Sequence, residues 1–196
     1  MTLKQKYGFQ VIDEFDMENE SMNKNLLIVG AGAYGLVARE IAESMGCFDK
    51  IDFIDDNAES AFDGTKIIGR VADIENLQSH YNNIVVAIGN PNVRITLIQK
   101  IKNETSCSVI SLISPLAYVA PSAIIGDGCI IEPMATVHAA CNLGIGCLIC
   151  AGAVVNHASE CCDGVHVDCN ATVPGYVKVS PATKVYSGTV YNNSDT

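Results

Sequence analysis

The stretch "CIIEPMATVHAACNLGIGCLICAGAVV", residues 129–155, repeats one pattern every six residues. A branched aliphatic residue recurs at each sixth position, and a small residue stands two positions before it. The branched residues are Ile131, Val137, Leu143, Ile149 and Val155, and the small ones are Cys129, Ala135, Cys141, Cys147 and Ala153. This period matches neither an alternating strand nor an α-helix, so it indicates an internal repeat.

The same six-residue step continues on both sides of this stretch. Counted from Ile113 to Tyr191, twelve of the fourteen positions are Ile, Val or Leu, and no insertion breaks the period. Such hexapeptide repeats are typical of a left-handed parallel β-helix, in which three steps close one turn. We therefore predict an all-β domain of about four turns over residues 109–196, with the branched residues inside a triangular prism.

The repeat register also assigns the cysteines of this region. Four of them fall at interior positions: Cys129, Cys141, Cys147 and Cys161. We predict that these four are compact apolar fillers of the core. Cys150, Cys162 and Cys169 fall at other phases and are not expected to converge, and the Cys147-x-x-Cys150 pair has no second pair to complete a zinc knuckle. No metal is expected.

Residues 25–108 alternate strand and helix signals. The segments "NLLIVG", "KIDFID" and "NIVVAIG" read as buried strands, whereas "YGLVAREIAESMG" and "NVRITLIQKIKNE" read as helices. This alternation predicts a small Rossmann-like α/β unit with a parallel sheet.

A glycine motif, "GAGAYG" at residues 30–35, joins the first strand to the first helix. Glycines there let a phosphate approach the helix N-terminus, and two aspartates end the next strand, where a ribose would lie. The unit is too short for both halves of a dinucleotide site, so UDP of a nucleotide sugar fits better than NAD. A tight turn without a ligand is the alternative. The candidate binding residues are Gly30, Gly32, Gly35, Asp55, Asp56, Gly89 and Asn90.

Composition and charge narrow the function classes further. The formal net charge of -10 argues against nucleic acid or an acidic membrane as a partner. Nine cysteines at irregular spacing, without a run of eighteen apolar residues, predict a reduced cytoplasmic protein with no membrane insertion. The polar residues 1–24 are predicted to be a tail, with disorder or packing on the domain as alternatives.

The order of these motifs carries a resemblance. The glycine motif, "FIDDN", "VVAIGN", the hexapeptide run and "VVNHASECCDGVH" follow one another as in the sialic acid O-acetyltransferase and bacillosamine-pathway UDP-amino-sugar N-acetyltransferase family, which this chain resembles from Asn23 onward. The resemblance implies acetyl-CoA as co-substrate, a nucleotide sugar as acceptor, and a homotrimer whose active site lies between two subunits. It further implies His157 as the catalytic base, His166 along the acetyl-CoA groove, and Gly175 as oxyanion donor.

The inferred reaction is direct acetyl transfer to a UDP-linked 4-amino sugar, with neutral His157 accepting the proton. Sugar O-acetylation and a non-catalytic, trimeric nucleotide-sugar-binding protein are the alternatives. The second alternative is raised by Ala158, which stands where the family has a Glu or Asp that orients the histidine. Tyr34 also replaces a histidine that many relatives carry, and Lys178 and Lys184 are the only cations after Lys102 to meet CoA phosphates.

Overall fold

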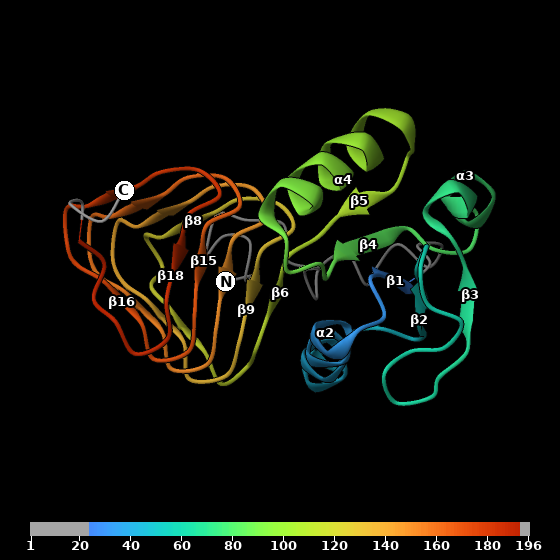
Figure 1. Cartoon of the computed structure of the whole chain (residues 1–196), viewed down its shortest axis with the longest axis horizontal. Coiled ribbons are helices and arrows are strands. Elements are labelled where there is room, and N and C mark those ends of the chain that lie inside the picture. The colour runs from blue at the N-terminus through green and yellow to red at the C-terminus, as the bar shows by residue number, and fades with distance from the viewer. Residues whose placement is uncertain (1–23, 193–196) are drawn as a thin grey trace.

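The computed structural model describes residues 24–192 of the chain. The predicted tail lies almost entirely outside the described residues, so that prediction is left open. The described part consists of an α/β unit followed by stacked coils of short parallel strands, and Figure 1 shows the two side by side. The predicted fold class, an α/β domain followed by a left-handed parallel β-helix, is confirmed.

The α/β unit is a five-stranded, all-parallel sheet with the strand order β3-β2-β1-β4-β5. Its strands are β1 (Leu26–Val29), β2 (Ile51–Ile54), β3 (Ile67–Gly69), β4 (Asn83–Val86) and β5 (Ser108–Val109). Its helical segments are α2 (Ala33–Met45), the short η2 (Val71–Asp73) and α3 (Ile74–Leu77), and α4 (Pro91–Glu104). The three predicted strands are present, and β3 and β5 are additions. Both additions are short edge strands, which carry little periodic signal.

The two long helices cover opposite faces of this sheet. Ala38 and Ile41 of α2 pack with Leu26 and Ile28 of β1, whereas α4 packs on the face that carries Leu27 and Val29. The strand order reverses between β1 and β4, so the loops that follow these two strands meet at the carboxyl edge of the sheet. In open α/β sheets this switch point is where ligands bind.

The β-helix has three faces of parallel strands. Face 1 contains β6 (Leu112–Ile113), β9 (Ile130–Ile131), β12 (Leu148–Ile149), β15 (His166–Val167) and β18 (Lys184–Val185). Face 2 contains β7 (Tyr118–Val119), β10 (Thr136–Val137), β13 (Val154–Val155) and β16 (Thr172–Val173). Face 3 contains β8 (Ile124–Ile125), β11 (Asn142–Leu143), β14 (Glu160–Cys161) and β17 (Lys178–Val179). Neighbouring strands pair in steps of eighteen residues, as Leu112 with Ile130 and Ile130 with Leu148.

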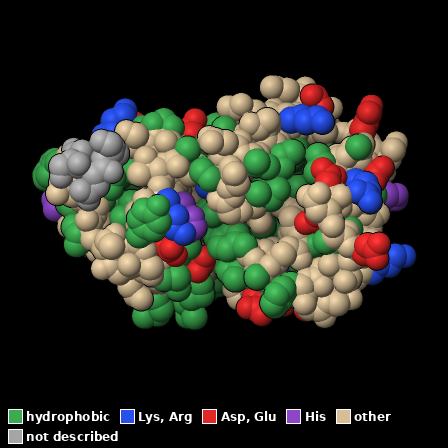
Figure 2. Space-filling model, in the orientation of Figure 1, with side chains coloured by type: hydrophobic (Ala, Val, Ile, Leu, Met, Phe, Trp, Pro, Cys, Tyr) green, Lys and Arg blue, Asp and Glu red, His purple; other side chains and the backbone are tan. Residues whose placement is uncertain are grey.

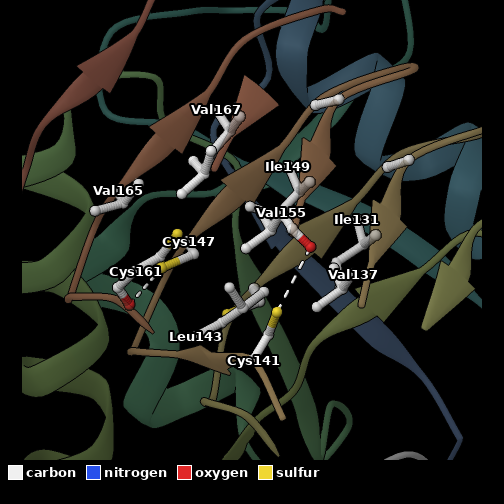
Figure 3. Close-up of a cluster of buried hydrophobic side chains, with 14 of the residues drawn as sticks. Ile131, Val137, Cys141, Leu143, Cys147, Ile149, Val155, Cys161, Val165 and Val167 are labelled. Carbon is white, nitrogen blue, oxygen red and sulfur yellow. Dashed lines mark hydrogen bonds between the residues drawn. The ribbon is translucent and has the colours of Figure 1, made fainter. Parts of the chain in front are cut away.

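The interior of the prism follows the predicted hexads. The branched position is fully or nearly fully buried from Val119 to Val185, and Ile113 is partly buried at the open first coil. Figure 3 shows these side chains pointing toward one another between the coils. The small position is buried from Ala123 to Ala171, with Val165 among its residues, and a partly buried Val177 occupies it in the next coil. The position therefore tolerates valine.

The interior cysteines do more than the predicted apolar filling. Cys129, Cys141 and Cys147 each donate a thiol hydrogen bond to the backbone carbonyl fifteen residues later, at 3.1, 3.0 and 3.3 Å. Ser159 makes the same contact to Pro174 at 2.6 Å with its hydroxyl. The turns leave carbonyl groups outside the strand ladders, and an interior donor at the small position satisfies them.

Every sixth residue from Gly128 to Gly188 has a positive φ and turns the chain at a corner of the prism. Three of these residues, Gly128, Gly146 and Gly164, stack along the corner between faces 3 and 1. A Cβ atom added to Gly128 or Gly146 would lie 2.8 Å from Ile98 of α4, and one on Gly164 would lie 2.5 Å from Ile95. This glycine column therefore lets α4 approach the coils closely.

One apolar cluster contains residues of both the α/β unit and the β-helix. The outward side chains of Leu112, Ile130 and Leu148 on face 1 are fully buried in the cluster that contains α2. Arg94 of α4 is also fully buried and joins the two parts. Its guanidinium donates to the carbonyl oxygens of Ile88 and Gly89 in the α/β unit and of Gly146 and Gly164 in the glycine column, at 2.6–3.0 Å. Within residues 24–192, no helix has the length and apolar character needed to cross a bilayer.

Candidate functional site

His157 lies on an exposed turn at the corner between faces 2 and 3, directly after β13. Its ring Nδ1 is 2.8 Å from Oδ1 of Asn156, and its backbone N–H donates to the same oxygen at 2.8 Å. The imidazole is therefore held in one orientation by the residue that precedes it.

Gly175 stacks on His157 one coil further along, as its eighteen-residue separation predicts. A Cβ atom on Gly175 would lie 3.1 Å from Cε1 and 3.2 Å from Nε2 of His157. A side chain at this position would crowd the ring, so the glycine keeps that side of Nε2 open. Tyr176 covers another side, with its ring edge-on to the imidazole at a centroid distance of 5.1 Å.

Two interior donors support this turn from beneath. The Cys141 thiol donates to the carbonyl oxygen of Asn156, and the Ser159 hydroxyl donates to that of Pro174, next to Gly175. The turn that carries His157 and the one that carries Gly175 are thus both fixed to the core of the prism.

Ala158 follows His157 with a φ of 55° at the left-handed corner position. Two nearby side chains that could replace the missing acid, those of Glu160 and His138, have other partners. Glu160 pairs with Lys178 at 2.7 Å, and His138 lies edge-on to Tyr118. The hydrogen-bond partner of the His157 ring is Asn156.

His166 lies on face 1, away from His157, in a partly buried polar cluster. Its Nε2 is 3.2 Å from Sγ of Cys150 and 3.9 Å from Asp168, which pairs with Lys184 at 2.9 Å. Burial and the charge of Lys184 lower the pKa of His166 to about 4, although Asp168 opposes this shift. The imidazole is therefore neutral at physiological pH.

The same cluster brings together side chains of metal-ligand type. The ligand atoms of Cys150, His166 and Asp168 lie within 4.8 Å of one another, and so do those of Glu132, Cys150 and Cys169. The phase argument did not anticipate that Cys150 and Cys169 approach each other. Both carboxylates already have partners, because Lys184 pairs with Asp168 and the backbone N–H of Ala151 donates to Glu132 at 3.0 Å.

The glycine motif forms the loop between β1 and α2. Gly30 has a φ of 105°, and a Cβ there would lie 2.9 Å from the carbonyl oxygen of Ala87, so the loops after β1 and β4 touch. A Cβ on Gly35 would overlap the carbonyl oxygen of Gly30. Gly32 is different: it is exposed at the N-cap of α2, and a Cβ there would meet open space. Gly30 and Gly35 thus build the loop, whereas Gly32 leaves open space at the N-terminus of α2.

The two predicted aspartates organise the surrounding loops. Asp55 accepts hydrogen bonds from the backbone N–H groups of Ala31, Asn57 and Ala58, at 2.8–3.1 Å. Burial opposes its ionisation, but these three donors hold its pKa below the ordinary value. Asp56 accepts from the backbone N–H of Val71 at 2.9 Å. A direct role in ribose binding would use the remaining lone pairs of these carboxylates.

Gly89 and Asn90 end the loop after β4. The Asn90 side chain caps α4 by accepting from the backbone N–H groups of Asn92 and Val93. The Gly89 carbonyl accepts from Arg94. Both residues are exposed at the switch point, so the structure brings all seven predicted nucleotide-side residues to one edge of the sheet.

Two residues that support the site, Asn156 and Arg94, were not predicted from the sequence. Asn156 carried a signal, because a side-chain amide directly before a histidine on a turn can bond its ring. Arg94 carried none, because nothing local distinguishes it from an ordinary surface arginine of a helix.

Both parts of the chain are similar to known proteins. Residues 25–101 match the PglD N-terminal domain family. The chain is similar to the acetyltransferase domain of PglB from Neisseria gonorrhoeae, with 29% identity, a TM-score of 0.81, and coverage of 86% of this chain and 82% of that one. A structure of that domain in complex with acetyl coenzyme A matches with a TM-score of 0.82 at the same identity and coverage.

A more distant match is a histidine variant of GDP-perosamine N-acetyltransferase from Caulobacter crescentus, in complex with CoA and GDP-perosamine. It is 21% identical, has a TM-score of 0.75, and covers 86% of this chain and 88% of its own. At 21% identity this match supports the fold alone.

Proposed function

We propose that this chain is an acyltransferase of the bacillosamine-pathway acetyltransferase family and that it transfers the acetyl group of acetyl-CoA to the amino group of a UDP-linked 4-amino sugar. The structural relatives are acetyltransferases, and one was solved with acetyl-CoA. The sugar, its nucleotide and the role of His157 belong to the proposal.

The proposed chemistry is a single direct transfer. The amine nitrogen attacks the carbonyl carbon of the thioester and its proton passes to Nε2 of His157. The C–S bond then breaks, and the proton passes from His157 to the sulfur, so that CoA leaves as the thiol. Negative charge develops on the carbonyl oxygen, which the backbone N–H of Gly175 would stabilise. The observation that carries this proposal is the pairing of His157 with Gly175 across one coil.

The positions of the glycine motif and of His157 favour an active site that is shared between two subunits. The α/β unit packs on face 1 and on the corner between faces 3 and 1, whereas His157 lies at the corner between faces 2 and 3. In a triangular prism this corner is opposite face 1. An acceptor bound to the glycine motif would therefore meet the His157 of a neighbouring chain, as in the homotrimer that the family resemblance implies.

Local cations on the donor side remain few. Figure 2 shows sparse Lys and Arg side chains on the β-helix half of the face in view, and Lys178 and Lys184 are each paired with an acid. CoA phosphates would have to share these lysines with Glu160 and Asp168. We expect donor affinity to be modest and to fall with salt.

The hydrogen bond that orients the His157 ring favours an enzyme over the non-catalytic alternative. Ala158 removes the family's orienting acid, but Asn156 supplies the hydrogen bond to Nδ1. O-acetylation would use the same base and the same donor, so the acceptor decides between the two reactions.

The test is an acceptor panel. The protein is incubated with acetyl-CoA and UDP- or GDP-linked amino and hydroxy sugars while CoA thiol release is followed. Release with a UDP-linked 4-amino sugar, lost in His157→Ala, supports the proposal. Release only with hydroxy sugars would move it to O-acetylation, and tight nucleotide binding without any release would favour the non-catalytic alternative.

A further inference from the structure

The side chain of Asn156 makes two hydrogen bonds to one residue. Its Oδ1 accepts from the backbone N–H of His157 and lies 2.8 Å from the ring Nδ1 of the same residue. The backbone N–H can only donate, so the atom that faces it is the amide oxygen and not the amide nitrogen.

This assignment fixes the proton on the ring. An amide oxygen carries no proton, so the Nδ1 that faces it must be the donor. A neutral imidazole has only one N–H, which leaves Nε2 with a free lone pair. Nε2 is the ring nitrogen on the Gly175 side, 3.2 Å from where a Cβ of that residue would stand.

The amide is itself held in place. The backbone N–H of Asn156 donates to the carbonyl of Val173 at 3.0 Å, and its own carbonyl accepts from the Cys141 thiol at 3.0 Å. Asn156 is only partly exposed, whereas His157 is exposed. A supported, half-buried amide thus restrains an exposed ring.

We propose that Asn156 is the positioning residue of this enzyme: it selects the Nδ1–H tautomer of His157 and aims Nε2 at the thioester. This inference rests on the proposed role of His157 as general base. Asn156 takes the place of the acid that Ala158 lacks, with one difference. A neutral amide orients the ring through a hydrogen bond alone, whereas a carboxylate partner would add the attraction of a negative charge for the imidazolium.

The first test reads the tautomer directly and needs no activity. The chain has four histidines, so ¹⁵N-histidine spectra are simple, and His157→Ala identifies the signals of this ring. At about pH 8, where free imidazole is neutral, we expect a protonated Nδ1 and an unprotonated Nε2. Asn156→Ala should give averaged signals of both tautomers. A protonated Nε2 in the parent protein, or spectra unchanged by Asn156→Ala, would overturn the proposal.

The second test separates positioning from folding. Asn156→Ala should lower kcat by about tenfold or more with little change in the KM of either substrate. Asn156→Asp should restore the rate and move the acid limb of the pH–rate profile upward, because a carboxylate stabilises the imidazolium. Asn142→Ala, an exposed position on face 3, is the matched control and should behave as the parent.

The outcomes distinguish this inference from the proposed function. If His157→Ala retains full activity, the role of His157 as base fails, whatever the spectra show. If His157→Ala is inactive but Asn156→Ala is as active as the parent with an unchanged pH profile, only the positioning role of Asn156 fails.

Discussion

The Cys141 thiol lies 3.0 Å from the carbonyl oxygen of Asn156, fifteen residues further along the chain. This bond links the core of the prism to the residue that holds His157. Burial raises the pKa of Cys141, so the group stays a neutral thiol and keeps its donor proton. A packing position of the hexapeptide repeat therefore also supports the candidate site.

We expect Cys141→Ser to preserve this support and Cys141→Ala to lose it. Alanine leaves the carbonyl without its thiol donor and should lower the free energy of unfolding by about 1–3 kcal/mol, whereas serine keeps a donor. Urea denaturation of the two variants measures the difference. Equal stability of the two variants would show that the thiol acts only as a filler.

His157→Ala should lower the rate of acetyl transfer by about a hundredfold to ten-thousandfold, because the attacking amine loses its proton acceptor. Nucleotide binding and assembly should be unchanged, which calorimetry and sedimentation can verify. His138→Ala is the control, because that ring packs on Tyr118. A larger effect in the control would transfer the role of base to His138.

The free energy of unfolding should decrease as the pH is lowered below about 6.5, because His166 is buried in its neutral form. Its pKa is about 4 in the folded chain and about 6.5 in the unfolded chain, so between these values only the unfolded state takes up the proton. The contribution is complete above about pH 6.5 and falls by up to about 3 kcal/mol as pH approaches 4.

Urea denaturation at several pH values tests this, with His166→Gln as the comparison. The variant should have a shallower slope in the same window, while Asp168 and other acids still contribute. Parallel slopes would mean that His166 titrates alike in both states.

Arg94→Met should destabilise the chain by about 3 kcal/mol or more, because four carbonyl oxygens lose a charged donor. It should also weaken nucleotide binding, since Ile88 and Gly89 belong to the loop after β4. Lys100→Met, on the same helix but at an exposed position, serves as the control. Urea denaturation measures the loss of stability, and calorimetry measures the loss of nucleotide affinity. A variant with parental stability and affinity would contradict both predictions.

Gly32→Leu and Gly35→Ala should fail in different ways. Space is open at Gly32, so its variant should fold but lose affinity for a UDP-linked ligand, whereas the Gly35 variant collides with Gly30 and should lose stability. Circular dichroism and calorimetry separate the two effects. A Gly32→Leu protein with parental affinity, or NAD as the preferred ligand of the parent, would place the ligand elsewhere.

The sequence was most informative where one residue type serves one purpose. Val137 or Ile149 recurs because the branched position points into the apolar core of the prism, so the hexads could be read without coordinates. The stacking of Gly175 on His157 followed from the eighteen-residue coil.

The remaining features depend on contacts between distant segments or on side-chain rotamers. Arg94 is buried only because the glycine column meets α4, and the approach of Cys150 to His166 depends on how face 1 is covered. The thiol donors were invisible because cysteine suits a small apolar site equally well. Asn156 was not predicted because the resemblance places the orienting residue after His157, whereas Asn156 precedes it.

The glycine column has a consequence for how the two parts of the chain are aligned. The next residue in the column after Gly164 is Ala182, whose methyl group would stand in the path of α4 if the α/β unit were shifted by one coil. Glycine at three coils and alanine at the fourth thus determine where α4 packs along the β-helix. Coils could be added beyond Ala182 during evolution without moving the nucleotide unit, whereas a coil inserted within the column would need its own glycine.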